Sequence, residues 1–179
     1  MSSMKKNCSK NKGISLVEII VSMGLFALLM TVGAGAVVNV LDARNKAREI
    51  RMAVDNVSTA LEYMSRELRF GYDFDCEDRG WRHDCPAGDE TIRFLDYAGK
   101  EITYTLSGGA ITRNKEGTVY PLTGTTNMTI NNLDFYVNGS LAADVFQPFI
   151  TIVVKGTAVA GKQPVPFLLQ TSVSARSRI

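Results

Sequence analysis

An apolar run near the N-terminus constrains the fold of this chain more than any other feature. No residue from Ile19 to Val38 carries a formal charge. About 20 such residues form roughly 30 Å of α-helix, which is enough to span the hydrocarbon core of a bilayer. Glu18 immediately precedes the run, although an ionised carboxylate inside a bilayer costs about 2.5–3.5 kcal/mol. The run therefore predicts a membrane-spanning helix whose carboxylate either lies near the membrane surface or has a function.

Basic residues precede this run. Residues 1–13 contain four lysines and no acid, and because the whole chain of 179 residues has a net charge of +2, the remainder carries −2. Lysines in this position predict that the N-terminus stays on the cytoplasmic side of the membrane. A secretory signal peptide is one alternative, because Ala34-Gly35-Ala36 has the form of a cleavage site, but the run exceeds the usual ~7–15 apolar residues. A plain membrane anchor is the other alternative.

The segment Lys12-Gly13-Ile14-Ser15-Leu16-Val17-Glu18 resembles the processing site of type IV prepilins and type II secretion pseudopilins. The shared pattern is a short basic leader, a glycine, an apolar residue, and a glutamate as the fifth residue of the processed chain. A long apolar helix follows, and the resemblance covers residues 5 to about 40. Ile14 stands where phenylalanine or methionine is commoner in the family.

The resemblance implies that a prepilin peptidase, a membrane aspartyl enzyme, cleaves after the leader, residues 1–13, and methylates the new N-terminus at Ile14. Glu18 is four residues further on, where a helix would place it on the same face. Its carboxylate can offset the new amine within one subunit or in a neighbour, so the resemblance assigns it to assembly. The implied partners are other pilin or pseudopilin subunits. The chain would be a single-pass signal-anchor protein with an extracytoplasmic head, and then part of a fibre in the periplasm or at the cell surface.

A heptad-like stripe follows the apolar run. Its small or apolar residues recur at steps of four and three: Ala43, Ala47, Ile50, Val54, Val57, Leu61, Met64 and Leu68. No proline occurs before Pro86, so the sequence predicts one helix from Ile14 to about Phe70 that stops at Gly71. Residues 14–41 would be its transmembrane or fibre-core half, and 42–70 its amphipathic half, packed on the head. A separate coiled coil is the alternative.

Residues 71–90 are polar and aperiodic, which predicts a loop. Cleavage would remove Cys8 with the leader, leaving Cys76 and Cys85 in an extracytoplasmic segment where disulfides persist. We expect a bridge between them, with free thiols as the alternative, since a zinc site needs more ligands than His83 supplies. The acidic side chains of this loop could bind calcium. However, EF-hand spacing is missing from the sequence, so a solvated loop without a cofactor is the expectation.

Residues 91–179 read as a β-sheet head. Alternating or short apolar runs predict about six antiparallel strands, separated by glycine-containing turns. The strand sequences are TIRFLDY, EITYTLS, GAITRN, MTINNLDFYV, FITIVVKG and PFLLQTSVSA. A long helix followed by such a head predicts an α+β, pilin-like fold. The segment from Thr91 to Arg113 is similar to the larger minor pseudopilins of the J type.

Motifs for catalysis are missing from the sequence. It has one histidine, and it contains no phosphate loop, dinucleotide-binding glycine motif, nucleophile elbow or zinc signature. The head has no basic stripe, so DNA is an unfavoured but open partner class. The predicted function is a non-enzymatic minor pilin or pseudopilin at or near a fibre tip. The alternative is a single-pass, membrane-anchored extracytoplasmic binding protein that does not polymerise.

Overall fold

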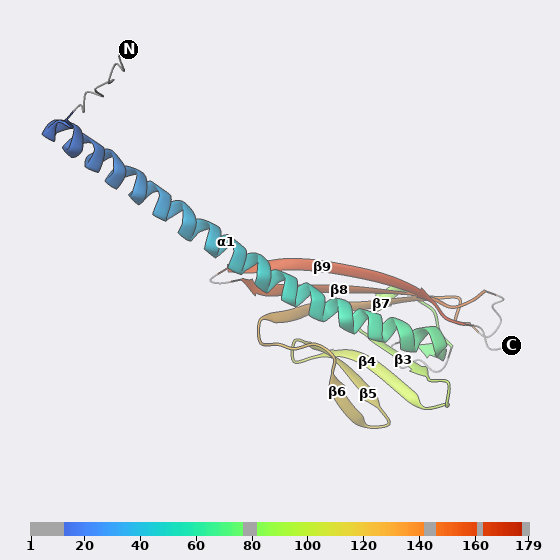
Figure 1. The fold of residues 1–179 in the computed structure, drawn as a ribbon. Helices are drawn as coiled ribbons and strands as arrows, with labels where there is room; N and C mark the ends of the chain where they lie inside the picture. The colour runs from blue at the N-terminus through green and yellow to red at the C-terminus, as the bar shows by residue number, and fades with distance from the viewer. Residues whose placement is uncertain (1–12, 77–81, 142–145, 161–162, 177–179) are drawn as a thin grey trace, which may run out of the picture. The chain divides into compact units, whose positions relative to one another are not determined.

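The computed structural model describes residues 13–76, 82–141, 146–160 and 163–176. It divides into two units, residues 1–44 and residues 45–179, and the boundary falls within helix α1, Leu16–Phe70. Figure 1 shows α1 and the strands of the second unit, which we call the head. Each unit is described by itself below.

Helix α1 begins and ends close to the predicted residues. The backbone N–H groups of Glu18 and Ile19 donate to the carbonyl of Ser15, at 3.0 and 3.3 Å, which starts the helix two residues later than expected. The helix ends at Phe70, as predicted, and the N–H of Gly71 donates to the carbonyl of Leu68 at 3.2 Å. A glycine is required there because a Cβ at position 71 would lie 2.4 Å from a ring carbon of Phe94.

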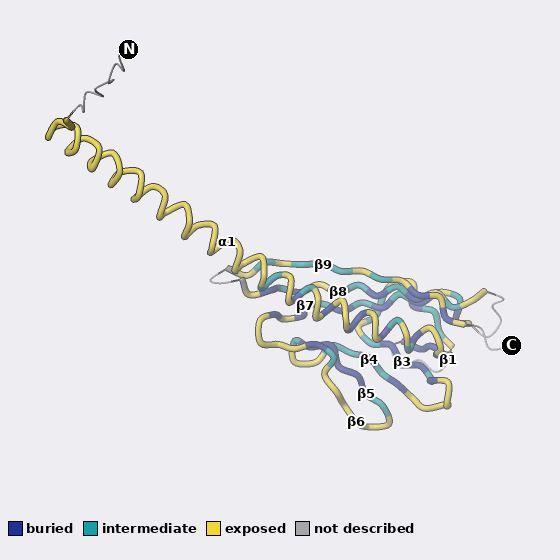
Figure 2. Tube along the Cα trace, in the orientation of Figure 1, coloured by how far each residue is buried: buried dark blue, intermediate teal, exposed yellow. Residues whose placement is uncertain are grey.

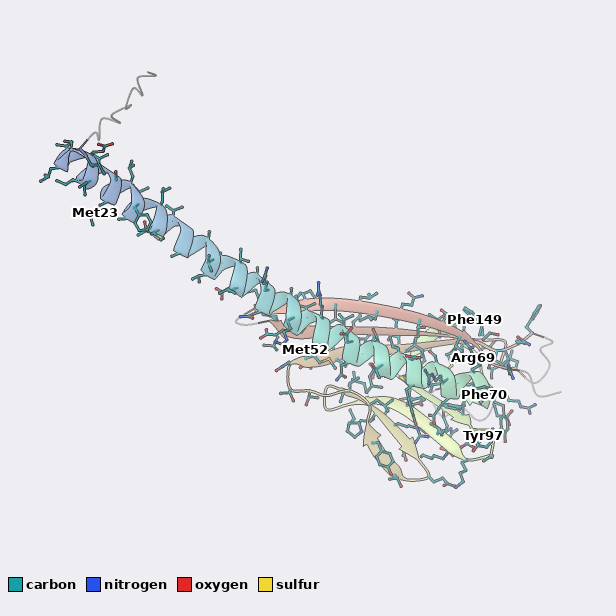
Figure 3. All side chains as sticks on the ribbon, viewed as in Figure 1. Met23, Met52, Arg69, Phe70, Tyr97 and Phe149 are labelled. Carbon is teal, nitrogen blue, oxygen red and sulfur yellow. A yellow bond between two sulfur atoms is a disulfide. The ribbon has the colours of Figure 1, made fainter. Side chains whose placement is uncertain are left out.

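The part of α1 in the first unit is exposed over its whole length, as the yellow tube in Figure 2 shows. Apolar side chains project from all of its sides, Met23 among them (Figure 3). A helix that is apolar all round needs an apolar environment. This segment is long and apolar enough to cross a membrane. The structure thus contains the predicted apolar half of the helix.

The part of α1 in the head buries one stripe against the sheets. Its buried residues are Ala53, Val57, Ala60, Leu61, Met64 and Leu68. Four of them belong to the predicted stripe, and all but Ala60 share a single core with strand residues, so this part of α1 is a covering helix rather than a separate coiled coil. Ala43 and Ala47 are exposed. The heptad pattern includes them because periodicity shows which face is apolar, but not how much of that face the sheets cover.

The head contains two antiparallel sheets. Their strands are β1 Tyr72–Asp75, β2 Cys85–Asp89, β3 Thr91–Leu95, β4 Glu101–Ser107, β5 Ala110–Lys115, β6 Thr118–Pro121, β7 Met128–Asn138, β8 Phe149–Ala160 and β9 Gln163–Ser174. The five-stranded sheet has the order β1-β3-β4-β5-β6, and the four-stranded sheet has the order β2-β7-β8-β9. The six predicted strands correspond to β3, β4, β5, β7, β8 and β9. The expectation of one sheet of about six strands is therefore corrected to two sheets, with nine strands among the described residues.

The three additional strands are short and lie at sheet edges. β1 and β2 fall within residues 71–90, which the sequence predicted to be a loop, and each pairs irregularly with its neighbour. All four residues of β6 are exposed. Each of these strands forms backbone hydrogen bonds with a longer neighbour, so it can form without an alternation of apolar residues. Residues 77–81, part of the predicted loop, lie outside the described part of the chain.

Aromatic side chains from the five-stranded sheet fill much of the core. Phe74, Phe94 and Tyr104 are fully buried, on β1, β3 and β4. Their rings stack in sequence, with centroids 5.7 and 5.8 Å apart. Leu133, Phe135 and Ile152 contribute from the four-stranded sheet. The helix and the two sheets share one hydrophobic core, which confirms the predicted α+β class.

Candidate functional site

The predicted processing site lies before the first turn of α1. Gly13 and Ile14 have no regular secondary structure, and Ile14 is 72% exposed. A Cβ added at Gly13 would meet nothing within 4 Å, so its glycine is not required by packing in this structure. The bond between these residues is therefore accessible, and a peptidase can bind it without unwinding the helix. The four leader lysines and Cys8 lie outside the described residues.

Glu18 is an exposed residue in the first turn of α1. Its backbone carbonyl accepts a hydrogen bond from the Ser22 hydroxyl at 2.6 Å. Ile14 precedes the helix, so the expected same-face relationship between Ile14 and Glu18 is not formed in this unprocessed chain. The physical reason is that the carbonyl of Ser15 accepts the first helical hydrogen bonds, so the helix does not extend to Ile14.

The predicted disulfide is present between Cys76 and Cys85, with their Cα atoms 6.3 Å apart. Cys76 follows β1, at the edge of the five-stranded sheet, and Cys85 opens β2, at the edge of the four-stranded sheet. Both cysteines are buried. The bridge therefore connects the two sheets of the head, whereas the sequence indicated only a closed loop.

Four carboxylates of residues 71–90, the segment predicted to be a loop, have partners within the head. Asp73 binds Arg82, Asp75 binds Arg93, Asp84 accepts from the backbone N–H groups of Gly139 and Ser140, and Asp89 accepts from that of Thr91. These partners lie on several strands and turns of the head. The described residues contain no group of three or more potential metal-binding side chains. Two further acids of this segment, Glu77 and Asp78, lie outside those residues.

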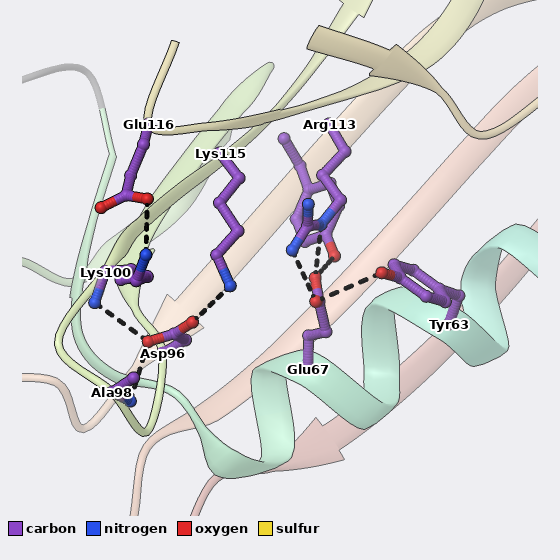
Figure 4. Close-up of polar contacts among 9 residues, drawn as sticks. Tyr63, Glu67, Asp96, Ala98, Lys100, Arg113, Lys115 and Glu116 are labelled. Atoms are coloured by element: carbon purple, nitrogen blue, oxygen red, sulfur yellow. Dashed lines mark hydrogen bonds and ion pairs between the residues drawn. The ribbon is translucent and has the colours of Figure 1, made fainter. Parts of the chain in front are cut away.

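An ion pair that sequence reasoning missed holds α1 on the five-stranded sheet. Nη2 of Arg113, on β5, lies 2.7 Å from Oε1 of Glu67, and its Nε lies 2.9 Å from Oε2 (Figure 4). The Tyr104 hydroxyl also donates to Glu67, and Tyr63 donates at 3.3 Å. Glu67 belongs to the polar face of an amphipathic helix, where a solvated carboxylate is the usual interpretation. Its neighbours in the sequence therefore do not distinguish it from a solvated carboxylate.

Electrostatics in this cluster favour the charged pair. Burial opposes ionisation of Glu67, but the hydrogen bonds and charge of Arg113, with the two tyrosine hydroxyls, outweigh it and hold the pKa of Glu67 below its ordinary value. The hydrogen bonds to Glu67 raise the pKa of Arg113. Burial and the hydrogen bond to Glu67 raise the pKa of the Tyr104 hydroxyl. The shifts keep Glu67 and Arg113 charged, which favours the ion pair that connects the helix to the sheet.

A second carboxylate, Asp96, closes the turn between β3 and β4. Its Oδ2 lies 2.7 Å from Nζ of Lys115, and its Oδ1 accepts from the backbone N–H groups of Ala98 and Lys100 at 2.8 and 2.9 Å (Figure 4). Burial opposes its ionisation, but these three partners prevail and lower the pKa of Asp96. Like the Glu67 cluster, this arrangement links elements of the head that are distant in sequence.

Comparison with known proteins identifies the N-terminal segment. Residues 8–34 match the family described as the prokaryotic N-terminal methylation motif. The match includes Gly13, Ile14 and Glu18, together with most of the apolar run. No curated protein and no solved structure matches the chain.

The chain thus carries the signature of type IV prepilins and pseudopilins, as the resemblance predicted. The motif implies processing by a prepilin peptidase and assembly with other pilin subunits, and proteins of this kind are structural rather than catalytic. With its apolar N-terminal helix, the chain fits a membrane-anchored precursor that later forms a fibre. The match ends at residue 34, so it does not distinguish a J-type subunit.

Proposed function

We propose that this protein is a non-enzymatic minor pilin or pseudopilin subunit. It is cleaved after Gly13, methylated at Ile14, and assembled into a type IV pilus-like or type II secretion fibre. The observation that carries the proposal is the methylation motif at residues 8–34, which includes most of the exposed run of α1 from Ile19 to Val38 that carries no formal charge. A β-sheet head with an inter-sheet disulfide supports an extracytoplasmic position for the rest of the chain.

In this proposal, cleavage creates the partner of Glu18. The new amine at Ile14 is cationic and must enter an apolar helix bundle, where an unpaired charge is costly. A carboxylate at position 18 compensates it, either from the same chain or from the adjacent subunit. Removal of the leader also frees residues 14 and 15 from the preceding backbone, so the helix can extend to the new N-terminus and bring the two groups onto one face.

We further propose a position at or near the fibre tip. Support comes from the similarity of the segment from Thr91 to Arg113 to the larger minor pseudopilins of the J type. That segment comprises β3, β4 and most of β5. Quantitative mass spectrometry of purified fibres tests this position, because a tip subunit is present in few copies per fibre. Copy numbers equal to those of the major subunit would contradict it.

The N-terminus of the mature chain tests processing and separates the competing functions. Mass spectrometry of the protein from its own membranes should find methylated Ile14 as the first residue. Retained Met1 would indicate the membrane-anchored binding protein, and Val37 would indicate a secreted protein released by a signal peptidase. Co-purification of the chain with fibre subunits then tests assembly, since a processed chain that never enters a fibre would contradict the proposed role.

A further inference from the structure

Four strands form the edges of the two sheets, and three of these edges are interrupted. β1 has four residues, with Asp73 at a φ of 55°, and pairs irregularly with β3. β6 has four residues and ends in Pro121. β2 has five residues, contains Pro86 and pairs irregularly with β7. Short strands, prolines and irregular pairing are devices by which natural sheets avoid pairing with other chains.

The fourth edge, β9, lacks these devices over most of its length. It has twelve residues, none of them charged, and it pairs with β8 residue for residue from Gln163 to Ser174. Its two prolines, Pro164 and Pro166, lie in the first third of the strand. In Figure 1, β9 is the red strand at the end of the four-stranded sheet. The segment after Pro166 is therefore a regular and uncharged edge, the kind that pairs readily with another strand.

Backbone hydrogen bonds show which groups of β9 face outward. The N–H of Ala175 donates to the carbonyl of Pro148, on the β8 side, at 2.8 Å. Because N–H directions alternate along a strand, even-numbered residues direct theirs away from β8. Arg176 follows this rule, since its N–H donates to the carbonyl of Arg69 in α1 at 2.9 Å. Pro164 and Pro166 also fit, because a proline is tolerated where no ladder hydrogen bond is needed.

Leu168, Gln170 and Ser172 therefore belong to an open row of backbone N–H and C=O groups that point away from β8. No backbone hydrogen bond joins these three residues to another element in the described part of the chain. Their side chains lie on the exposed side of the strand, and that of Leu168 is 61% exposed. A second extended backbone is the structure whose donors and acceptors match this spacing.

We infer that the β9 edge from Leu168 to Ser172 is a docking surface for an extended, uncharged strand of a different fibre subunit, which adds a fifth strand to the β2-β7-β8-β9 sheet. The inference rests on the proposed function, because it requires a neighbouring subunit. The partner strand is uncharged because the open row offers no charge to pair with one. Antiparallel pairing with β9 of a second copy does not fit this role, since it would set the head segments of α1 antiparallel, whereas subunits inserted from one membrane share a direction.

Site-specific photo-crosslinking tests the docking surface in the full-length chain in its own cells. A benzoylphenylalanine at Ser172 should form an adduct with another chain that carries its own N-terminal methylation motif, identified by mass spectrometry. Gln170→Pro should reduce this adduct by about tenfold or more, because it removes an outward N–H and places a ring at the edge. The Gln170→Pro variant retains the backbone hydrogen bonds between β8 and β9, because the N–H of residue 170 points away from β8, as positions 164 and 166 also do. Gln170→Ala is the matched control, because it retains the N–H, and it should give the wild-type yield.

Gln170→Lys provides a second variant that does not depend on proline being tolerated. It leaves the backbone intact, adds a charge to the edge, and should also reduce the adduct. An intact Cys76–Cys85 bridge and an unchanged melting temperature establish that each variant is folded. Wild-type adduct yields from both folded variants would overturn the docking surface, as would an adduct with β9 of a second copy or with a protein that lacks the motif. A wild-type chain that does not co-purify with fibre subunits would instead overturn the proposed function on which the inference rests.

Discussion

Arg113 of β5 binds Glu67 of α1 through two nitrogens, one to each carboxylate oxygen. The arginine side chain is 9% exposed and the glutamate side chain 23% exposed. A paired geometry of this kind is charge-assisted and directional, and partial burial reduces its screening by water and salt. The pair therefore fixes the rotation of the head segment of α1 against the five-stranded sheet.

Glu67→Gln should lower the free energy of unfolding of the head by about 2–3 kcal/mol, because it leaves the charge of Arg113 nearly buried without a counter-ion. Urea denaturation of the full chain in detergent, followed by circular dichroism, measures this change. Glu62→Gln is the control, because it removes the same group from an exposed pair with Arg66 and should cost at most about 0.5 kcal/mol. Equal losses in the two variants would contradict a structural role for the Glu67–Arg113 pair.

Acid should destabilise the head as Glu67 and Asp96 become protonated. The pKa values of both groups are lowered in the folded chain, from ordinary values of 4.5 and 3.8. Each group therefore contributes stability above its unfolded pKa, and this contribution is lost as the pH falls through its folded pKa. The melting temperature should hold steady above about pH 5.5 and decline below about pH 4.5.

Asp96→Asn separates the two contributions to this acid response. The variant should start with a lower melting temperature at neutral pH, because the ion pair with Lys115 is lost, and its decline below pH 3.8 should be shallower. Melting temperatures of both chains, recorded from about pH 2 to 7, provide the comparison. Parallel curves would show that Asp96 does not contribute to the acid response.

The Cys76–Cys85 bridge should contribute about 2–3 kcal/mol to the free energy of unfolding, since it closes a loop of about ten residues. The double variant Cys76→Ala with Cys85→Ala should lose this amount in the same urea experiment. Mass spectrometry should find the non-reduced protein two hydrogens lighter than the reduced protein. Cys8→Ala is the control and should leave that difference unchanged. Alkylation of both thiols without a reductant would contradict the bridge.

Gly13→Leu should block removal of the leader, because the peptidase must accommodate the residue before the scissile bond, whereas Gly13→Ala should be partly tolerated. Immunoblotting of cells that express each variant distinguishes the precursor from the shorter mature chain. Gly24→Leu is the matched control, because a Cβ at Gly24 would likewise meet nothing within 4 Å, but this glycine lies inside α1. Normal mature protein from Gly13→Leu would contradict the prepilin mechanism.

Glu18→Leu should leave membrane insertion unimpaired and cleavage largely intact, while assembly fails. An unpaired buried amine at Ile14 costs about 3–5 kcal/mol, which lowers incorporation by roughly two to four orders of magnitude if it acts wholly in docking. Co-purification of the cleaved variant with its fibre partners measures this effect. Ser22→Leu also replaces a polar residue of α1 by leucine, but it removes no charge, so it should be recovered like the wild type. Wild-type recovery of Glu18→Leu would place the carboxylate at the membrane surface without an assembly role.

The sequence by itself determined the features that depend on local order along the chain. The processing motif around Gly13, the uncharged run from Ile19 to Val38 and the end of α1 at Phe70 are all encoded by neighbouring residues. Helical periodicity likewise identified the stripe that includes Val57 and Leu61, because residues three and four positions apart share a helix face. The long strands β7, β8 and β9 were predictable from their apolar alternation.

Tertiary structure decided what depends on residues that are distant in sequence. Glu67 and Arg113 are 46 positions apart, and no local pattern distinguishes this carboxylate from a solvated one. β1, β2 and β6 form because longer strands offer them backbone partners, so their own residues need no alternation. The same holds for the division into two sheets, for the disulfide that joins their edges, and for the open row on β9. Each results from hydrogen bonding or packing between segments whose proximity exists only after the chain has folded.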